Sequence, residues 1–300
     1  MEKEILLCDC NEIEEKIMKE IKNYLPQEVN IASVESYETV KNNGKKLNGM
    51  VIRKEGCKIA PVIYLDSFIA KIENGVSFEL VMRELADLYI QNASELSDME
   101  ERHATLDLMD YDSIKDKIVC KLINLDRNIE FLQDKAHSFV SDLAVIYQIE
   151  IMNDESGCTA HTITKRLLES YNVTVEQLHE QAISNMRNRK FLFEKLSEFM
   201  GWQYPGVEDH LWILTSKNFV NGASLILIPE VRDKILRQLG DVYIMPSSIY
   251  EMLIVKKSLG FHEDEINSTI RDGNKRVQME EYLSSHAYQL SDFDDVKVDQ

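Results

Sequence analysis

The run His210–Val255 constrains the fold of this chain most, because every local signal in it agrees. Two apolar, strand-like segments, Leu211–Ser216 and Ala223–Pro229, flank an Asn221-Gly222 pair that is typical of a turn. The next segment, Glu230–Gly240, has the spacing of an amphipathic helix that ends at a glycine, and two more β-rich segments follow. The run contains no nucleophile–base pair, metal-ligand cluster or phosphate loop, so it predicts a fold and no reaction.

The chain has 300 residues, 44% hydrophobic and 29% charged, which is ordinary for a soluble globular protein with one large or two modest domains. Its opening, MEKEILLCDC, is acidic where a secretory leader would be basic, and no apolar run is long enough to span a membrane. The cysteines are odd in number and scattered, which favours a reducing compartment. We therefore expect a cytoplasmic protein that does not bind membranes.

A net charge of −18 dominates the electrostatics of the chain. Such a field repels nucleic-acid backbones, anionic lipids and polyanionic substrates. The simpler interpretation is that the charge keeps the protein soluble. The alternative is an acidic surface that imitates nucleic acid and inhibits a DNA-binding protein, since acidic residues gather at 95–116 and at 280–300.

The first 95 residues predict helices around a small sheet. A four-residue apolar spacing over 11–25 predicts an amphipathic helix with Ile13, Ile17, Ile21 and Leu25 on its inner face. Residues 29–37 and 47–54 are rich in β-branched side chains and predict a hairpin that turns at Asn43-Gly44. A third strand over 59–65 leads into a short helix. A longer helix over 77–92 is expected to turn three leucines inward: Leu80, Leu85 and Leu88.

The rest of the chain begins with a polar, acidic segment, 93–109, that predicts a linker, although a solvated helix fits the same pattern. A helix is expected from about Asp112 through residue 132. Leu143–Ile151 predicts a strand whose apolar first half is buried. Further helices are predicted at 162–170, 175–188, 190–199 and 262–276.

We predict the α+β class, with antiparallel strand pairs covered by helices in two closely packed parts. The strand–turn–strand–helix order at 51–75 returns at 212–240, which allows either a ββα pseudo-repeat or chance. The expected boundaries are 1–95 for the N-terminal part, 96–110 for an acidic linker, 111–290 for the C-terminal part and 291–300 for a disordered tail.

Five blocks of the chain stand at a characteristic spacing: KLINLDRN (121–128), SDLAVIY (141–147), NGASLILIPE (221–230), GDVYIMPSSIYEMLIV (240–255) and NKRVQMEEYLSSHAY (274–288). Through them the chain resembles, over roughly residues 50–290, a bacterial family of domains of unknown function, number five-six-eight-eight. A fainter likeness, to the uncharacterised family one-four-four-four, rests on DLAVIYQI and VTVEQLHEQAISNM. The chain departs from the first family before His137, where a proline is expected, and this puts a role for His137 in doubt. The resemblance implies a fold and a domain extent, and no activity.

The motifs of cofactor and metal sites are missing from the sequence. Cys8 and Cys10 have no second ligand pair that would complete a tetrahedral site. The histidines show neither HExxH nor HxH spacing, and there is no glycine-rich phosphate loop. The basic segment 185–190 has the character of a solvated helix end. We therefore expect no cofactor, no metal and no direct nucleic-acid binding.

Five polar residues form the candidate cleft: Asp142, Asn221, Ser247, Ser248 and Glu251. The turn Pro246–Glu251 presents two hydroxyls, with a carboxylate three residues after Ser248. No GxSxG or SxxK motif supplies a base or an oxyanion site, so the hydroxyls equally fit a role in holding the turn. Asp142 precedes a buried strand, where it either lines a cleft or caps the preceding turn. We assign no catalytic residue.

These observations favour an uncharacterised, cytoplasmic, non-enzymatic binding or interaction protein with an unidentified protein partner. The alternative is a hydrolase with a site assembled around Asp142 and the Pro246–Glu251 turn, which requires the five side chains to converge in one pocket. The nucleic-acid mimic is a further alternative, and it requires salt-sensitive capture of a basic partner.

Overall fold

The structure is a computed structural model that describes residues 10–26, 28–55, 60–103, 107–154, 157–201 and 210–298. The chain forms two compact units, one of residues 1–41 and 45–105 (unit 1) and one of residues 42–44 and 106–300 (unit 2). Among the described residues, the strands form three antiparallel sheets that are joined and covered by helices. The predicted α+β class is confirmed. None of the helices described is both long and apolar enough to cross a membrane.

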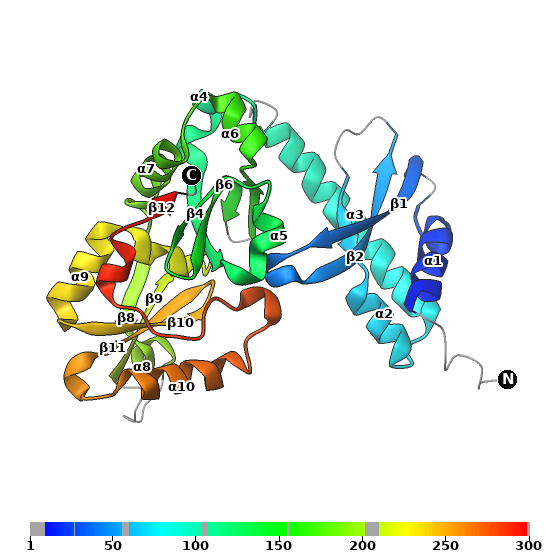
Figure 1. The fold of residues 1–300 in the computed structure, drawn as a ribbon. Coiled ribbons are helices and arrows are strands. Elements are labelled where there is room, and N and C mark those ends of the chain that lie inside the picture. Colours follow the sequence, from blue (N-terminus) through cyan, green and yellow to red (C-terminus); the bar gives the residue numbers. More distant parts are fainter. Residues whose placement is uncertain are drawn as a thin grey trace. The chain divides into compact units, whose positions relative to one another are not determined.

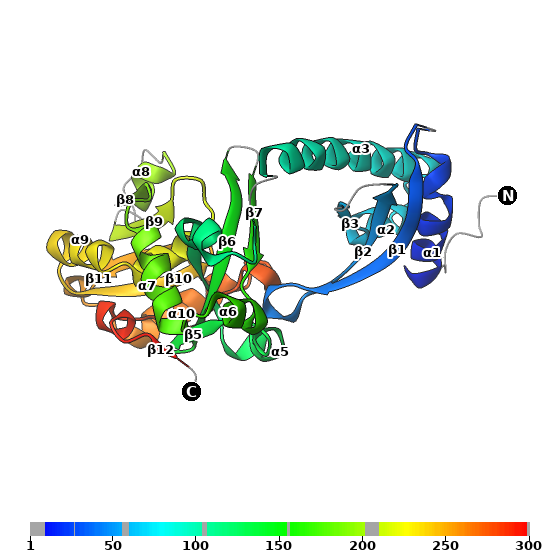
Figure 2. The ribbon, with the colours of Figure 1, turned by 90° about the horizontal axis from the view of Figure 1, so that it is seen from above.

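Unit 1 is a three-stranded sheet, in the order β1-β2-β3, packed with helices (Figure 2). The predicted hairpin is confirmed, because β1 and β2 pair antiparallel on either side of the Asn42–Gly44 turn. The elements are α1 (Cys10–Glu20), η1 (Ile21–Asn23), β1 (Ile31–Val40), β2 (Lys46–Lys54), β3 (Val62–Tyr64), α2 (Asp66–Glu73) and α3 (Phe78–His103).

The core of unit 1 follows from helical periodicity. The four residues of the predicted stripe are all buried: Ile13, Ile17, Ile21 and Leu25. They pack with Met50 and Ile52 of β2 and with Leu85 of α3. Leu80 is an exception to the prediction, since 59% of it is exposed. The helix α3 continues to His103, so residues 93–103 are helical where a linker was the first expectation.

Unit 2 contains a four-stranded sheet, β10-β11-β9-β8, and a five-stranded sheet in which β12-β5-β6-β4 is extended by β7 pairing with β6. Helix α7 packs on β4, and α10 packs on β10 (Figure 1). The elements are η2 (Asn42–Gly44), α4 (Tyr111–Ile114), η3 (Lys115–Lys117), β4 (Ile118–Asn124), η4 (Asp126–Asn128), α5 (Ile129–Leu132), β5 (His137–Val140), β6 (Leu143–Asp154), β7 (Gly157–Thr162), α6 (Lys165–Tyr171), α7 (Val175–Met186), β8 (Phe191–Lys195), α8 (Leu196–Phe199), β9 (Leu211–Ser216), η6 (Gly222–Leu227), α9 (Pro229–Leu239), β10 (Val242–Ser248), β11 (Glu251–Lys256), η7 (Lys257–Leu259), α10 (Glu263–Asn274), η8 (Met279–Glu281), η9 (Leu290–Phe293) and β12 (Lys297–Val298).

The prediction of one long helix from Asp112 is wrong beyond Lys117. Ile118–Asn124 is the strand β4, which pairs antiparallel with β6. Every residue of β4 except Lys121 is buried. A strand that is covered on both faces shows no polar alternation, and periodicity alone does not distinguish such an apolar run from a buried helix.

The second apolar segment of the run 210–255 is also not the predicted strand. Gly222–Leu227 forms the 3-10 helix η6, and all of its residues are buried. The backbone N–H of Leu122 in β4 donates to the Ser224 hydroxyl at 2.9 Å. Because η6 replaces a strand, residues 212–240 do not repeat the strand–turn–strand–helix order, and the ββα pseudo-repeat is absent.

Two further predictions differ from the structure. Phe191–Lys195, expected to be helical, is the strand β8, paired with β9. The expected disordered tail has structure as far as Val298, because Phe293 is buried and Lys297–Val298 pairs with β5. The last two residues of that tail, and residues 56–59 and 202–209, lie outside the described residues.

Candidate functional site

Asp142 is the centre of a half-buried polar cluster in the turn between β5 and β6. Its Oδ1 accepts a hydrogen bond from the Tyr288 hydroxyl, and its Oδ2 accepts one from the Ser284 hydroxyl at 2.9 Å. The Nε2 of His286 lies 3.5 Å from Oδ1. Burial, followed by the nearby Asp142 carboxylate, raises the pKa of the Tyr288 phenol, so Tyr288 remains a donor.

This cluster contains the residue types of a hydrolytic triad in an arrangement that serves to anchor the chain. The Ser284 side chain is fully buried, and its hydroxyl lies 3.2 Å from the His286 Nδ1. The same hydroxyl donates directly to the Asp142 Oδ2, whereas in a triad the histidine stands between the serine and the carboxylate. Tyr288 also exchanges two backbone hydrogen bonds with Ile244 of β10, each at 2.8 Å. Asp142 therefore ties the 284–288 segment to the β5–β6 turn.

The other predicted residues lie elsewhere, and none of the five side chains hydrogen-bonds another. Asn221 precedes η6 in a left-handed conformation, and its Nδ2 donates to the Gln148 Oε1 at 3.1 Å. The Ser248 hydroxyl is buried and accepts from the Tyr250 backbone N–H at 3.0 Å, which holds its own turn. Ser247 and Glu251 are half-buried. The Asn221 loop meets the 246–251 turn at the backbone, where the Ala223 N–H donates to the Ile249 carbonyl at 3.4 Å.

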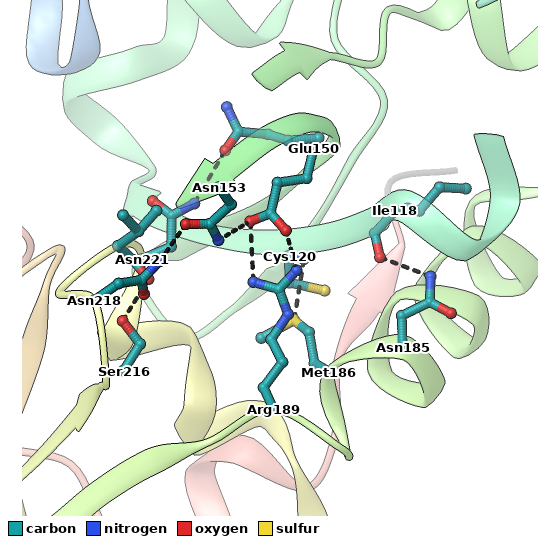
Figure 3. A network of polar contacts seen from close by, with 12 residues as sticks. Ile118, Cys120, Glu150, Asn153, Asn185, Met186, Arg189, Ser216, Asn218 and Asn221 are labelled. Atoms are coloured by element: carbon teal, nitrogen blue, oxygen red, sulfur yellow. Dashed lines mark hydrogen bonds and ion pairs between the residues drawn. The ribbon is translucent and has the colours of Figure 1, made fainter. Parts of the chain in front are cut away.

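A larger polar network connects two loops of unit 2 to strand β6 (Figure 3). Arg189, in the loop after α7, points its guanidinium at Glu150 of β6. Its Nη1 donates to Oε1 at 3.0 Å and its Nη2 to Oε2, which makes a two-pronged ion pair. Only 12% of the Glu150 side chain and 29% of the Arg189 side chain are exposed. Each charge therefore depends on the other for compensation.

Amide side chains extend this network on the far side of Glu150 (Figure 3). The Nδ2 of Asn153 donates to the Glu150 Oε1 at 2.7 Å, and the Nδ2 of Asn218 donates to the Asn153 Oδ1. With the Asn221–Gln148 bond, these contacts hold the 217–221 loop against β6. Sequence analysis missed Glu150 and Arg189, because the residues are far apart in the chain and no motif joins them.

Only a small cavity of about 10 Å³ lies beneath this network. That volume accommodates about one water molecule, so the network is a structural clamp with no room for an organic ligand. Burial raises the pKa of the Cys120 thiol in the cavity wall, which keeps that sulfur protonated and unreactive. The cavity is lined by Val119, Cys120, Met186, Arg189, Ser216, Val220, Asn221 and Leu225.

A pocket of about 400 Å³ beside α9 is large enough to hold a ligand, and we call it the α9 groove. One wall is a stripe of α9 with helical spacing: Pro229, Arg232, Asp233 and Leu236. The opposite wall and the end of the groove are Gln289, Leu290, Ser291 and Asp294, with Asp241, Val242 and Lys257.

The Arg232 side chain fixes the two walls of this groove to each other. Its Nη1 donates to the carbonyls of Ile226 and Leu227, each at 2.9 Å, and its Nη2 lies 3.0 Å from the Asp294 Oδ1. Only 11% of the Arg232 side chain is exposed. The groove is thus formed by held side chains and does not require rearrangement to open.

The groove surface combines apolar, anionic and cationic groups. Leu236 is 49% exposed and Leu290 is half-buried, whereas the carboxylates of Asp233 and Asp241 are exposed. The Lys257 ammonium lies 4.8 Å from the ring centre of Tyr243. Such a surface offers contacts for aliphatic side chains and for main-chain donors and acceptors. The sequence shows the helical spacing of residues 229, 232, 233 and 236. It does not show which face of this helix is left uncovered by the rest of the chain.

Core residue Tyr147 leads to a pH prediction. Its hydroxyl lies 2.7 Å from the Ser138 Oγ and 3.2 Å from the His179 Nδ1. Burial lowers the pKa of His179 below its usual 6.5. As the pH falls, the unfolded chain therefore binds a proton at His179 before the folded protein does, and this favours unfolding. The stability that neutral His179 contributes to the fold is complete above about pH 6.5 and declines below it. We expect the thermal midpoint to fall less between about pH 7.5 and about pH 5.5 in His179→Gln than in the wild type. An equal fall in both proteins would contradict this role.

Comparison with known proteins supplies a family and no relative of known function. The Family of unknown function (DUF5688) matches residues 10–291. The chain belongs to this family. No curated protein matches the chain, and no solved structure matches it. The DUF5688 match confirms the resemblance drawn from the five sequence blocks and extends it to the first helix, α1. The likeness to the family one-four-four-four stays a prediction.

Proposed function

We propose that this protein is a cytoplasmic, non-enzymatic binding protein, and that the α9 groove of unit 2 binds a polypeptide segment of a partner. The groove itself carries this proposal, because it is a formed pocket of about 400 Å³ with exposed leucine, carboxylate and ammonium groups. A peptide presents aliphatic side chains and main-chain amides together, which matches that mixture. The exposed Asp233 and Asp241, in a chain of charge −18, disfavour nucleic acid as the occupant.

The polar clusters outside the groove support binding over catalysis. The acceptors of Asp142 are engaged by Tyr288 and Ser284, and Arg189 compensates Glu150. These groups hold segments of the chain together, which is a structural use of the same chemistry that a hydrolase would expose. The groove gains from this rigidity, since a preformed site loses less conformational entropy when a ligand binds.

The test is selection of peptides from a displayed library of random segments of about twelve residues on the full-length protein. We expect the selected peptides to bind Leu236→Asp at least about tenfold more weakly, because the new charge removes the apolar contact. Gln238→Asp is the matched control on the same helix, outside the groove, and is expected to bind as the wild type does. Failure to enrich any peptide, or equal binding by Leu236→Asp, would refute the proposal.

A further inference from the structure

The charged side chains that line the α9 groove are unevenly compensated. The groove carries two cationic and three anionic side chains: Arg232, Lys257, Asp233, Asp241 and Asp294. Arg232 and Asp294 form an ion pair at 3.0 Å, and Arg232 also donates to two backbone carbonyls. The charges of these two residues therefore cancel, which leaves Lys257, Asp233 and Asp241.

The Lys257 ammonium is engaged at the edge of the groove by an aromatic ring. Its Nζ lies 4.8 Å from the ring centre of Tyr243. Tyr243 packs beside Ile266 and Ile270 of α10, whereas the preceding residue, Val242, belongs to the core cluster under α9. Because successive side chains of a strand point to opposite faces, the ring draws this ammonium toward the α10 side of β10. Lys257 therefore contributes its methylene stem to the groove more than its charge.

Asp233 and Asp241 have no such partner. Both are exposed, and neither forms an ion pair with a residue that the structure describes, the last-turn Arg237 of α9 included. Asp241 directly follows Gly240, where α9 ends. The C-terminal end of a helix carries a partial negative charge, which disfavours an acidic residue at this place. A bound cation beside Asp241 would offset that cost.

We propose that the segment bound in the α9 groove carries a lysine or arginine next to an aliphatic residue. This inference rests on the proposed peptide-binding function and specifies its ligand. Asp233 and Leu236 are three residues apart on α9 and hence neighbours on its surface. The basic side chain would pair with Asp233 and Asp241, while the aliphatic one would lie on Leu236 and Leu290. A metal ion fits less well, because the described residues include no group of three His, Cys, Asp or Glu side chains that could hold one.

The test repeats the peptide selection on the full-length wild type and on Asp233→Asn/Asp241→Asn. On the wild type we expect lysine and arginine to be at least about threefold more frequent in the selected peptides than in the unselected library. On the variant we expect this enrichment to be lost. The matched control, Asp126→Asn/Glu169→Gln, removes two exposed carboxylates of unit 2 outside the groove and should keep the enrichment.

A double-mutant cycle then measures the pairing itself. A selected peptide is compared with a version in which glutamine replaces its basic residue, and binding is followed by fluorescence anisotropy. We expect the peptide change and the Asp233→Asn/Asp241→Asn change each to weaken binding about fivefold. Both changes together are also expected to weaken it about fivefold, because the second change removes a group whose partner is already lost.

The possible failures are distinguishable. Selected peptides that are neutral or acidic, yet bind Leu236→Gln more weakly than the wild type, would overturn this inference and leave the proposed function standing. Loss of the enrichment in the control variant would also overturn it, because net charge would then attract the basic peptides. Independent effects in the cycle would do the same. Failure to select any peptide would contradict the proposed function and this inference with it.

Discussion

Replacing Gly222 by alanine is expected to prevent stable folding of unit 2. A Cβ at this position would lie 2.1 Å from the Tyr250 carbonyl oxygen and 2.7 Å from both the Ser216 nitrogen and the Thr215 Oγ1. The first two are backbone atoms, so the clash is not relieved by a change of rotamer. The segment 222–227 is buried between strands and cannot move outward without opening the core. We expect a loss of at least about 4 kcal/mol in the free energy of unfolding.

Tryptophan fluorescence during urea denaturation measures this loss, since both tryptophans of the chain belong to unit 2. Gly273→Ala is the matched control, because a Cβ at Gly273, inside α10, would meet nothing within 4 Å. Alanine there is expected to leave stability unchanged or to raise it by up to about 1 kcal/mol through helix propensity. A Gly222→Ala protein with the wild-type midpoint would show that η6 is not packed against the Tyr250 turn in this way.

Sequence patterns predicted the elements that have one buried and one exposed face. The stripe from Ile13 to Leu25 and the hairpin around Asn43-Gly44 carry such a contrast, and both are present. The predictions failed where every face is buried. The residues of β4 and of η6 are apolar in unbroken runs, and an unbroken run has no period from which helix and strand can be told apart.

The site could be predicted only in part, because its contacts join residues that are far apart in the sequence. Asp142 was singled out as a polar residue at the mouth of a strand, but its partners are Ser284 and Tyr288, more than one hundred residues later. Arg189 was assigned to a solvated helix end, yet it is the partner of Glu150. No local signal encodes such pairs, because each of these residue types is also common on protein surfaces, where it has no fixed partner.

The sequence blocks that identify the family share a physical role in unit 2. From the block 121–128, Asn124 donates through Nδ2 to the Leu283 carbonyl in the block 274–288. From the block 221–230, Ser224 accepts from the Leu122 backbone N–H. The blocks are thus joined to one another by buried hydrogen bonds. The family resemblance therefore reports on how unit 2 is held together.

The most connected of these bonds predicts the second large effect, at Asn128, which is 1% exposed. Its Oδ1 accepts from the Asn43 backbone N–H at 2.8 Å, and its Nδ2 donates to the Asn43 Oδ1 at 2.9 Å and to the Asn124 carbonyl at 2.7 Å. Asn43 in turn donates through Nδ2 to the carbonyls of Met279 and Tyr282, each at 2.7 Å.

Asn128→Ala leaves these buried donors and acceptors unpaired, and unpaired buried groups cost more than the hydrogen bonds contribute. We expect a loss of about 3 kcal/mol or more in the free energy of unfolding, measured by urea denaturation with tryptophan fluorescence. Asn188→Ala is the control, because it makes the same chemical change at an exposed position and should stay within about 0.5 kcal/mol of the wild type. If the two variants lose equal stability, the Asn42–Gly44 turn does not depend on Asn128, and the polar bonds of unit 2 add little beyond its apolar core.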